Sequence, residues 1–582
     1  MTTTLPATDV VICGLGWAGS VMLQSLADSG LRIVGLERGP EVSPAPGLEI
    51  GATEQDDLAS RRGRLMQDLS RETITFRHRR DQRALPMHRH GAFLQGEIVG
   101  GAGVTWNGIN TRYLPHDFAF RSHLAERGWL DKLPEDMIVE DFGLGYDELE
   151  PDYAWFEDVT GTTGQAGNLP GGRNPAGNPF EGPRSSEYPL PPLPDSMAGK
   201  LFRKAAAGMG YHPYTLPATN ASRDYVTPLG LKMGACVFCG FCDRFRCPVD
   251  AKGTPVNTLL NAVRDRANVD IRPNSRVLRV IRSADGTRAT GVEYVTAGGE
   301  HCIQPAETVV LSGYTFSNVH LMLVSGIGTP FDPATGEGTV GKGYAYHVRG
   351  GATAFFDEDV WINSFIGSGG LGTTMDDFNA PDFDSMAHGF VGGAMIGAEA
   401  SGSRPTAQTP TPSDVPRWGR AWKEAVPKHF NHTARLNVCG ASMSYRGNYL
   451  SLDPEFTDAW GRPMLRLTFD FGPNEVALSN FMTDRSVEIS ERMGAARVEA
   501  KPGRFPFDIR SYQGSHNTGG APMGRDPQTS AVDSHSRSWD VPNVFVVGGS
   551  SFPQLPGKNP TATIGALARR AARAVRADAH AT

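Results

Sequence analysis

Residues 9–39 of the chain read "DVVICGLGWAGSVMLQSLADSGLRIVGLERG". The apolar run Val10–Cys13 is followed by three glycines in the pattern G-x-G-x-x-G, and a helix-length segment then ends near Gly30. A second apolar run, Leu31–Leu36, comes next. Strand, glycine turn, helix and strand in this order are typical of a βαβ unit that binds a dinucleotide. We therefore predict an α/β fold that begins with a Rossmann-type domain.

The three glycines and an acidic residue indicate how this unit would bind its ligand. Gly14 permits the tight turn, Gly16 lets a pyrophosphate approach the backbone, and Gly19 lets the helix pack against the strand. Glu37 ends the second strand, where its carboxylate can accept hydrogen bonds from both ribose hydroxyls. Because that carboxylate disfavours a 2′-phosphate, we expect FAD or NAD rather than NADP.

Two further stretches favour FAD over NAD. The glycine-rich run "GEIVGGAGVTWNGINTRYLPHDF" has no purpose in a nicotinamide enzyme. Near the C-terminus, "NVFVVGGSSFPQ" and "NPTATIGALARR" place a turn and a helix start where a second diphosphate or a ring edge could dock. The cofactor-binding residues expected in these stretches are Gly101, Thr105, Asn107, Gly548 and Thr561.

The composition of the whole chain narrows the possible partners. It has 582 residues, a net charge of -7 and a pI of about 6.1, so we expect no nucleic-acid partner. No run approaches the roughly 18 apolar residues that a transmembrane helix needs. The N-terminus shows no export signal, so we expect a cytoplasmic location by default.

The Pro- and Gly-rich residues 163–196 are expected to form a long loop.

Four of the seven cysteines lie close together in the stretch "CVFCGFCDRFRC". They are Cys236, Cys239, Cys242 and Cys247. Their spacing, C-x2-C-x2-C-x4-C followed by Pro248, is close to the C-x2-C-x2-C-x3-C-P run of bacterial ferredoxins. Structural zinc sites more often use two C-x2-C pairs separated by a longer loop, and disulfides are disfavoured without an export signal. We expect an iron–sulfur cluster, with zinc and with free or paired thiols as the alternatives.

Six stretches spread over the whole chain carry a resemblance to a known family. They are "GLGWAGSVMLQSLADSGLRIVGLERG", "GGAGVTWNG", "CVFCGFCDRFRCPVDAKGTPVNTLL", "VVLSGYTFSNVHLMLVSGIG", "HNTGGAPMG" and "VPNVFVVGGSSFPQLPGKNPTATIGALA". In these stretches the chain resembles the glucose–methanol–choline (GMC) oxidoreductase family of flavoenzymes. It is similar in particular to the flavoprotein subunits of bacterial gluconate 2-dehydrogenase, fructose dehydrogenase and sorbitol dehydrogenase.

The resemblance implies which residues react. His516 falls where the family has an active-site histidine facing the flavin N5, and a neutral histidine suits removal of a hydroxyl proton as the C–H bond breaks. Asn559 falls at the second active-site position of the family and can hydrogen-bond the substrate oxygen. The resemblance also implies that three of the four cysteines hold a [3Fe-4S] cluster.

The expected fold has two parts that alternate along the chain. Residues 6–115, 225–330 and 510–582 are expected to form the Rossmann-type FAD-binding domain, and the second of these segments carries the four cysteines. Residues 116–224 and 331–509 are expected to form a substrate domain built on a largely antiparallel sheet with helices. The fold class is α/β for the first domain and α+β overall.

The expected activity is that of an FAD-dependent dehydrogenase. It would oxidise an alcohol of a sugar, sugar acid, polyol or glycoside by hydride transfer to FAD, and the cluster would pass the electrons to an external acceptor. The resemblance implies a cytochrome c subunit and a small exported subunit as partners, with a periplasmic or membrane-associated location if the chain is exported folded. The alternative is an oxidase of the same family that uses oxygen and has only a structural cysteine site.

Overall fold

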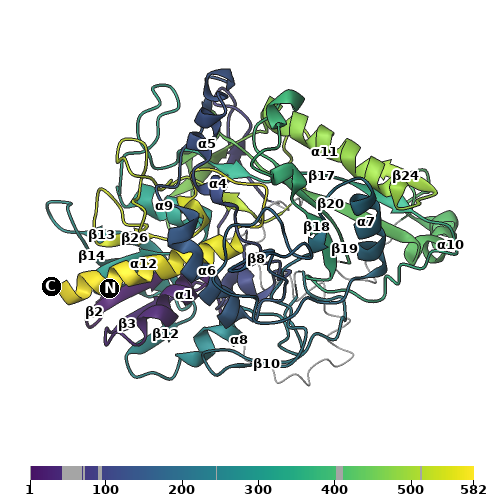
Figure 1. Ribbon diagram of the computed structural model, residues 1–582. Helices are drawn as coiled ribbons and strands as arrows, with labels where there is room; N and C mark the ends of the chain where they lie inside the picture. The colour runs from purple at the N-terminus through teal and green to yellow at the C-terminus, as the bar shows by residue number, and fades with distance from the viewer. Residues whose placement is uncertain are drawn as a thin grey trace.

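The computed structural model in Figure 1 contains two large sheets, each packed against helices of its own. The residues that it describes are 2–41, 69, 72–88, 95–243, 245–400, 411–511 and 514–581. The purple N-terminal elements lie beside the yellow C-terminal helix α12 (Thr561–Ala581), although they come from opposite ends of the chain. The two ends of the sequence therefore build one half of the molecule together.

The first sheet is mixed and has eight strands. Six follow the order β12-β3-β2-β15-β14-β13, and β1 and β26 also pair with β15. The bounds are β1 Thr3–Thr4, β2 Thr8–Cys13, β3 Ile33–Leu36, β12 Val269–Arg272, β13 Ser275–Arg282, β14 Ala289–Thr296, β15 His301–Leu311 and β26 Val544–Val546. Strands β12, β3, β2, β15 and β26 run parallel, whereas β13, β14 and β15 form an antiparallel meander. Strands β3 and β26 and residues Val10–Cys13 of β2 are apolar and buried, as expected for parallel strands covered on both faces.

Helix α1 (Trp17–Leu26) follows β2 and packs against α12, which also contacts α6 (Tyr146–Thr160). Glycines permit two close approaches, that of α1 to the turn after β2 and that of α12 to α6. A Cβ atom at Gly19 would lie 1.9 Å from the carbonyl oxygen of Gly14, and one at Gly565 would lie 2.4 Å from the Phe156 ring. A larger side chain at either position would force the backbones apart.

The second sheet is wholly antiparallel and has six strands in the order β24-β17-β20-β19-β18-β9. The bounds are β9 Tyr214–Thr215, β17 Val348–Phe355, β18 Gly372–Met375, β19 Ala394–Glu399, β20 Thr433–Gly440 and β24 Arg497–Ala500. Helices α7 (Met197–Gly208) and α11 (Pro473–Arg492) pack against it and share its apolar core. Phe202 of α7 and Met482 of α11, for example, belong to the same buried cluster as Leu436 of β20.

The remaining helices and strands lie outside the two large sheets and the helices described above. The helices are α4 Pro115–Phe118, α5 Phe120–Glu126, α8 Pro255–Thr258, α9 Thr315–Val324 and α10 Gly419–Phe430. The strands are β4 Thr75–Arg77, β5 Leu85–Pro86, β6 Met137–Ile138, β7 Asn168–Leu169, β8 Gly172–Arg173, β10 Tyr225–Val226, β11 Lys232–Met233, β16 Ala345–Tyr346, β21 Ser444–Tyr445, β22 Tyr449–Thr457, β23 Pro463–Thr468 and β25 Asn517–Thr518. The β16–β25 pair matters most for function, because it ties the C-terminal segment to the start of β17.

The predicted fold class is confirmed: a Rossmann-type sheet is joined to a largely antiparallel sheet. The predicted N-terminal helix ends at Leu26 rather than near Gly30, because residues 27–30 form a turn. The Pro- and Gly-rich residues 163–196 contain only the short β7–β8 hairpin. Within the described ranges, none of the helices has the length and apolarity needed to cross a membrane. The exact domain boundaries stay a prediction.

Candidate active site

A cavity of about 770 Å³ is lined by residues of both large sheets. Its lining includes His516 and Asn559 together with most of the predicted cofactor residues. Those residues are Gly14, Gly16, Glu37, Gly101, Thr105, Asn107, Gly548 and Thr561. Gly19 is not part of the lining, because it packs α1 against β2. Residues far apart in the sequence therefore meet around one elongated space.

Glu37 is one of the residues that line the cavity. It directly follows β3, and its buried carboxylate accepts hydrogen bonds from the N–H of Leu15 at 2.9 Å and the N–H of Gly39 at 3.0 Å. Burial raises its pKa, and the two backbone N–H groups oppose that rise. Each carboxylate oxygen has a second lone pair, so this part of the cavity can accept hydrogen bonds from hydroxyl groups of a ligand.

The glycine turn forms a narrow passage next to Glu37. Gly14 has a φ of +97°, and a Cβ atom there would lie 2.6 Å from the Cα of Gly313. Gly16 lines the cavity, and a Cβ atom there would meet no protein atom within 4 Å. The space beside Gly16 is therefore open to a ligand. Gly16 is also the N-cap of α1, where backbone N–H groups and the helix dipole favour a phosphate. These features fit the pyrophosphate of a dinucleotide.

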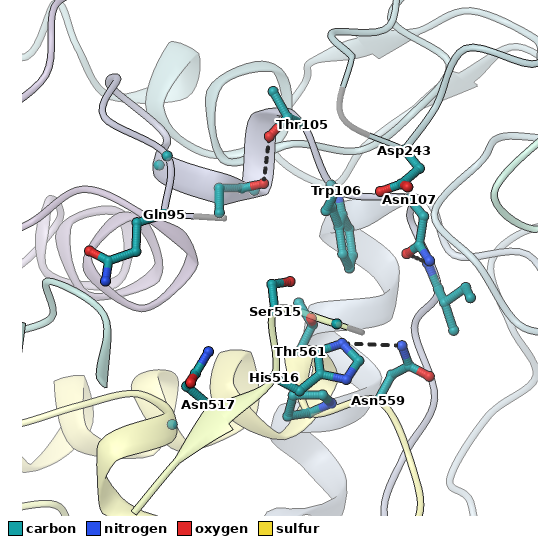
Figure 2. A pocket seen from close by; sticks show the side chains of 18 of the residues that line it. Gln95, Thr105, Trp106, Asn107, Asp243, Ser515, His516, Asn517, Asn559 and Thr561 are labelled. Atoms are coloured by element: carbon teal, nitrogen blue, oxygen red, sulfur yellow. Dashed lines mark hydrogen bonds between the residues drawn. The ribbon is translucent and has the colours of Figure 1, made fainter. Parts of the chain in front are cut away.

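His516 also lines the cavity, and Figure 2 shows it close to Asn559. The β16–β25 ladder pairs Tyr346 with Asn517, so the next residues along, His347 and His516, come together. Their Nδ1 atoms lie 2.8 Å apart, and the Nε2 atom of His347 lies 2.7 Å from the carbonyl oxygen of Pro556. The Nδ1 side of the His516 ring is thus held by a second histidine, His347.

These contacts assign the proton positions. A carbonyl oxygen only accepts, so His347 carries its proton on Nε2. Burial, together with the Arg349 guanidinium, lowers the pKa of His347 to about 3, so its Nδ1 stays an acceptor. His516 must then donate from Nδ1. Burial, together with His347 and the Arg349 guanidinium, also lowers the pKa of His516 well below its ordinary value, so its Nε2 stays unprotonated and can accept a hydrogen bond.

The Nε2 lone pair of His516 faces Asn559. The Asn559 Nδ2 atom lies 3.5 Å from it, and both side chains line the cavity with Trp106 and Asn107 (Figure 2). Asn559 is fixed by its neighbour, because the buried Lys558 ammonium forms a salt bridge with the Asp376 carboxylate just after β18. A neutral base and an amide are therefore presented together to a ligand in the cavity.

The wall that the second sheet contributes is rich in cations. The lining includes Arg349 of β17 and Arg435 of β20, and also Lys501 and Arg504, which follow β24. Its acidic members on this side are Asp243 and Glu399. Burial raises the pKa of Glu399 to about 7, against the opposing effect of the Arg349 guanidinium. The charge of this wall therefore changes near neutral pH.

Residues 236–247, here named the cysteine loop, border the cavity through Gly240 and Asp243. The Gly367 N–H donates to the carbonyl oxygen of Phe238 at 3.0 Å, and the Gly240 N–H donates to that of Gly367 at 2.9 Å. Phe238 has a φ of +54°, a conformation that bulky residues rarely adopt. Strain of this kind persists only where the surroundings hold it, and it is common at functional sites.

The four thiols of the cysteine loop are free in the structure. Burial raises the pKa of Cys236 to about 11 and also raises the pKa of Cys239 and of Cys242. Across the described residues, the one group of three or more His, Cys, Asp or Glu side chains with ligand atoms all within 4.8 Å of one another is His347, Cys439 and His516. No three sulfur atoms of the loop converge that closely. The sulfurs of a tetrahedral zinc site would lie about 3.8 Å apart, given Zn–S bonds of roughly 2.3 Å.

Two contacts that support the His516–Asn559 pair had no signal in the sequence. His347 lies 169 residues before His516, and only the β16–β25 register brings them together. Lys558 is next to Asn559, but its partner Asp376 lies 182 residues away. Sequence spacing alone could not pair His347 with His516 or Lys558 with Asp376.

The fold and the site define a class of protein. A Rossmann-type sheet supplies a hydroxyl acceptor and a phosphate cradle, and a neutral histidine base lines the same cavity. This arrangement suits an oxidoreductase that uses a dinucleotide cofactor to oxidise an alcohol.

Comparisons with known proteins narrow this class to a family. The GMC oxidoreductase family models match residues 195–349 and 444–568. The chain is 43% identical over 577 residues to the gluconate 2-dehydrogenase flavoprotein of Pantoea cypripedii, over 98% of this chain and 94% of the relative. It is 24% identical to the fructose dehydrogenase large subunit of Gluconobacter japonicus, over 98% of each. A solved structure of a formate oxidase from Aspergillus oryzae RIB40 shares the fold with a TM-score of 0.60 at 15% identity, over 100% of this chain and 99% of that one.

The chain belongs to the GMC oxidoreductase family and is an FAD-dependent alcohol oxidoreductase. The family resemblance predicted from the sequence is thereby confirmed, and so is FAD as the cofactor.

Proposed function

We propose that the chain is a dehydrogenase that oxidises an alcohol group of a sugar acid of the gluconate type and passes the electrons to an external acceptor through an iron–sulfur cluster. The observation that carries the proposal is the neutral His516, whose Nε2 lone pair is held beside Asn559 in the cavity. A base in this state can take a hydroxyl proton at neutral pH.

The residues that would hold FAD are those that line the cavity between Glu37 and His516. Glu37 would accept the ribose hydroxyls, and the N-terminus of α1 at Gly16 would hold the pyrophosphate. The N-terminus of α12 at Thr561 borders the same space and offers a second set of N–H groups. Bound FAD supplies the acceptor for a hydride from the carbinol carbon.

His516 and Asn559 would handle the substrate hydroxyl. His516 Nε2 takes the hydroxyl proton while the C–H bond breaks, and the carbinol becomes a carbonyl. Asn559 donates from Nδ2 to the substrate oxygen and so holds the carbinol against His516. His347 keeps the His516 proton on Nδ1 throughout, which leaves Nε2 as the reacting atom.

The charged wall supports a sugar acid as the substrate. Arg349, Arg435, Lys501 and Arg504 outnumber Asp243 and Glu399 in the lining on that side, which suits a carboxylate. The relative that is 43% identical over nearly the whole chain is named for gluconate. Gluconate carries both a carboxylate and a row of oxidisable carbinols.

The cysteine loop would hold the cluster, as a [3Fe-4S] group on three of the thiolates. In an iron–sulfur cluster the cysteines bind different iron atoms, so their sulfurs stand farther apart than in a zinc site. Sulfurs that do not converge within 4.8 Å fit the cluster better than zinc. The loop borders the cavity at Gly240 and Asp243, which suits a one-electron exit from bound FAD.

A partner protein would collect the electrons near the cysteine loop. Val237 in the loop and Phe365 and Ile366, just before Gly367, are large apolar side chains that are 60%, 62% and 41% exposed. The fructose dehydrogenase relative is named a large subunit, which supports a multi-subunit arrangement. We propose a cytochrome c subunit and a small exported subunit as partners. The location would be cytoplasmic for the chain alone, or periplasmic or membrane-associated if it is exported folded with them.

Substrate and oxidant can be tested together. Purified protein would be assayed with gluconate, glucose, a polyol and a methyl glycoside, using ferricyanide and oxygen in parallel, and analysed for FAD, iron and sulfide. We expect gluconate to be preferred, iron to be present, and turnover with ferricyanide to exceed that with oxygen by about tenfold or more. Equal turnover with oxygen in iron-free protein would instead identify an oxidase with a structural cysteine site.

A further inference from the structure

A buried lysine connects the cysteine loop to the cavity. Lys252 has no exposed surface, and its ammonium donates to three backbone carbonyl oxygens. The acceptors are Trp106 at 2.6 Å, Cys242 at 2.8 Å and Phe245 at 2.7 Å. Cys242 and Phe245 belong to the cysteine loop, whereas Trp106 lines the cavity beside Asn107. One ammonium therefore ties the two loops together.

Further hydrogen bonds fix this junction. The Trp106 indole N–H donates to the Gly253 carbonyl oxygen at 2.9 Å, and the Trp106 carbonyl oxygen accepts from Lys252. Both the ring and the backbone of Trp106 are therefore fixed by hydrogen bonds. Asn220 pairs with Lys252 in a β-bridge and donates from Nδ2 to the Cys242 sulfur at 3.5 Å. The ammonium, the Cys242 thiol and the cavity wall are thus held in one rigid arrangement.

The carboxylate of Asp243 favours the charged form of Lys252 but forms no salt bridge with its ammonium. Within the described ranges, no carboxylate oxygen lies within 4.0 Å of its ammonium. Three carbonyls satisfy its N–H groups but do not neutralise the charge, and a buried charge without a counter-ion costs free energy. With the thiols protonated, this ammonium has no counter-charge in contact with it, whereas thiolates that bind a metal cluster would supply one.

We propose that Lys252 is a positioning residue of the electron exit, whose ammonium is the buried counter-charge of the thiolate-bound cluster and raises its reduction potential. The proposal rests on the iron–sulfur cluster of the proposed function. Each electron that enters the cluster adds one negative charge, and a nearby positive charge in a buried site stabilises the reduced form. The bond to Trp106 also keeps the cavity wall against the cysteine loop.

The test compares two buried lysines in the full-length, cofactor-loaded protein. Lys252→Met keeps the apolar stem and removes the charge. Lys342→Met is the matched control, because Lys342 is also buried and donates to a carbonyl oxygen, that of Thr529 at 3.1 Å, away from the cavity lining. An EPR-monitored redox titration would give the midpoint potential of the cluster, and anaerobic stopped-flow would give the rate of flavin reduction by substrate.

We expect Lys252→Met to lower the midpoint potential, to slow acceptor-linked turnover by about tenfold, and to leave flavin reduction within about twofold of wild type. Lys342→Met should match wild type in all three. A full iron content with an unchanged potential in Lys252→Met overturns the proposal. Absence of iron from the wild type would instead reject the cluster itself and so the proposed function.

A second variant covers failure of the cluster to assemble. Lys252→Gln keeps hydrogen-bond donors but has no charge, so we expect the same negative shift. A wild-type midpoint potential in Lys252→Gln overturns the proposal that Lys252 is the counter-charge of the cluster. Loss of iron from both Lys252 variants, with thermal unfolding unchanged and with iron retained in Lys342→Met, supports a role of the Lys252 ammonium in holding the cluster, because both variants lose its charge while the fold stays intact.

Discussion

His516 and the cysteine loop border the same cavity, but they differ in whether the folded chain already gives them the protonation state that their proposed roles need. Around His516, hydrogen bonds from the Pro556 carbonyl through His347 fix the ring, its proton and its lone pair. In the cysteine loop, the backbone is pinned by Gly367, yet burial keeps three of the thiols protonated by raising their pKa values. The first region is ready to react as folded, whereas under the proposed function the second would acquire its working charge only together with the cluster.

The difference follows from the chemistry of each step. A proton acceptor must be neutral and oriented before the substrate arrives, and burial of an imidazole achieves both. Thiolates in a buried loop are unfavourable until a metal neutralises them, so their charge and the metal arrive together. Substitutions near His516 should therefore affect proton transfer alone, and substitutions in the loop should affect iron and electron exit alone.

The largest expected effect is that of His516→Ala. Removal of the base should lower turnover by about 10²–10⁴-fold, the usual contribution of a positioned general base. FAD and iron contents should stay at wild-type levels, since His516 is assigned to neither site. Steady-state assays and cofactor analysis would measure this. His301→Gln is the control, because His301 pairs with Glu293 at 3.0 Å on the first sheet, away from the cavity. Unchanged turnover in His516→Ala would remove it from its role.

The second largest effect should come from losing the proposed iron–sulfur cluster. Cys242→Ser is expected to lose iron and to slow acceptor-linked turnover by about 10–100-fold, in line with other metal sites. Flavin reduction in a single turnover should stay near wild type, because the base site is intact. The control is Cys302→Ser, which changes a buried cysteine of β15. Full iron in each of the four loop variants would show that the loop binds no cluster.

His347 gives a smaller effect and tests the proton assignment. His347→Leu removes the acceptor for the His516 Nδ1 proton, so His516 can carry its proton on Nε2 instead. We expect about a tenfold loss of turnover with little change in KM. His347→Gln offers both an acceptor and a donor and should recover much of the loss. Equal activity of the two variants would contradict the assignment.

The sequence was most informative where function depends on local spacing. The glycines and Glu37 lie in one short βαβ unit, and the cysteines lie within one loop, so their placement followed from residue order. Contacts made by the tertiary fold gave no such signal. His347 reaches His516 across 169 residues, and Lys252 reaches Trp106 across 146. Register between distant strands is set by packing of the whole core, which a single sequence does not display.

The smallest effect concerns the charged wall and depends on pH. Burial raises the Glu399 pKa from its ordinary value to about 7, so its carboxyl group is neutral below that pH and anionic above it. The new negative charge should repel a sugar acid, and the KM for gluconate should rise about threefold, roughly 0.7 kcal/mol, between pH 6 and pH 8. The turnover number should stay flat, because His516 is already neutral throughout.

Glu399→Gln has no charge to gain, so its KM for gluconate should not change over the same range. Glu140→Gln is the matched control: burial also raises the Glu140 pKa, but Glu140 lies outside the cavity lining, so its KM should still rise. A neutral polyol assayed alongside should show no rise with any variant. If the rise persists in Glu399→Gln, the carboxylate of the substrate lies elsewhere, and the wall of cations is not its binding site.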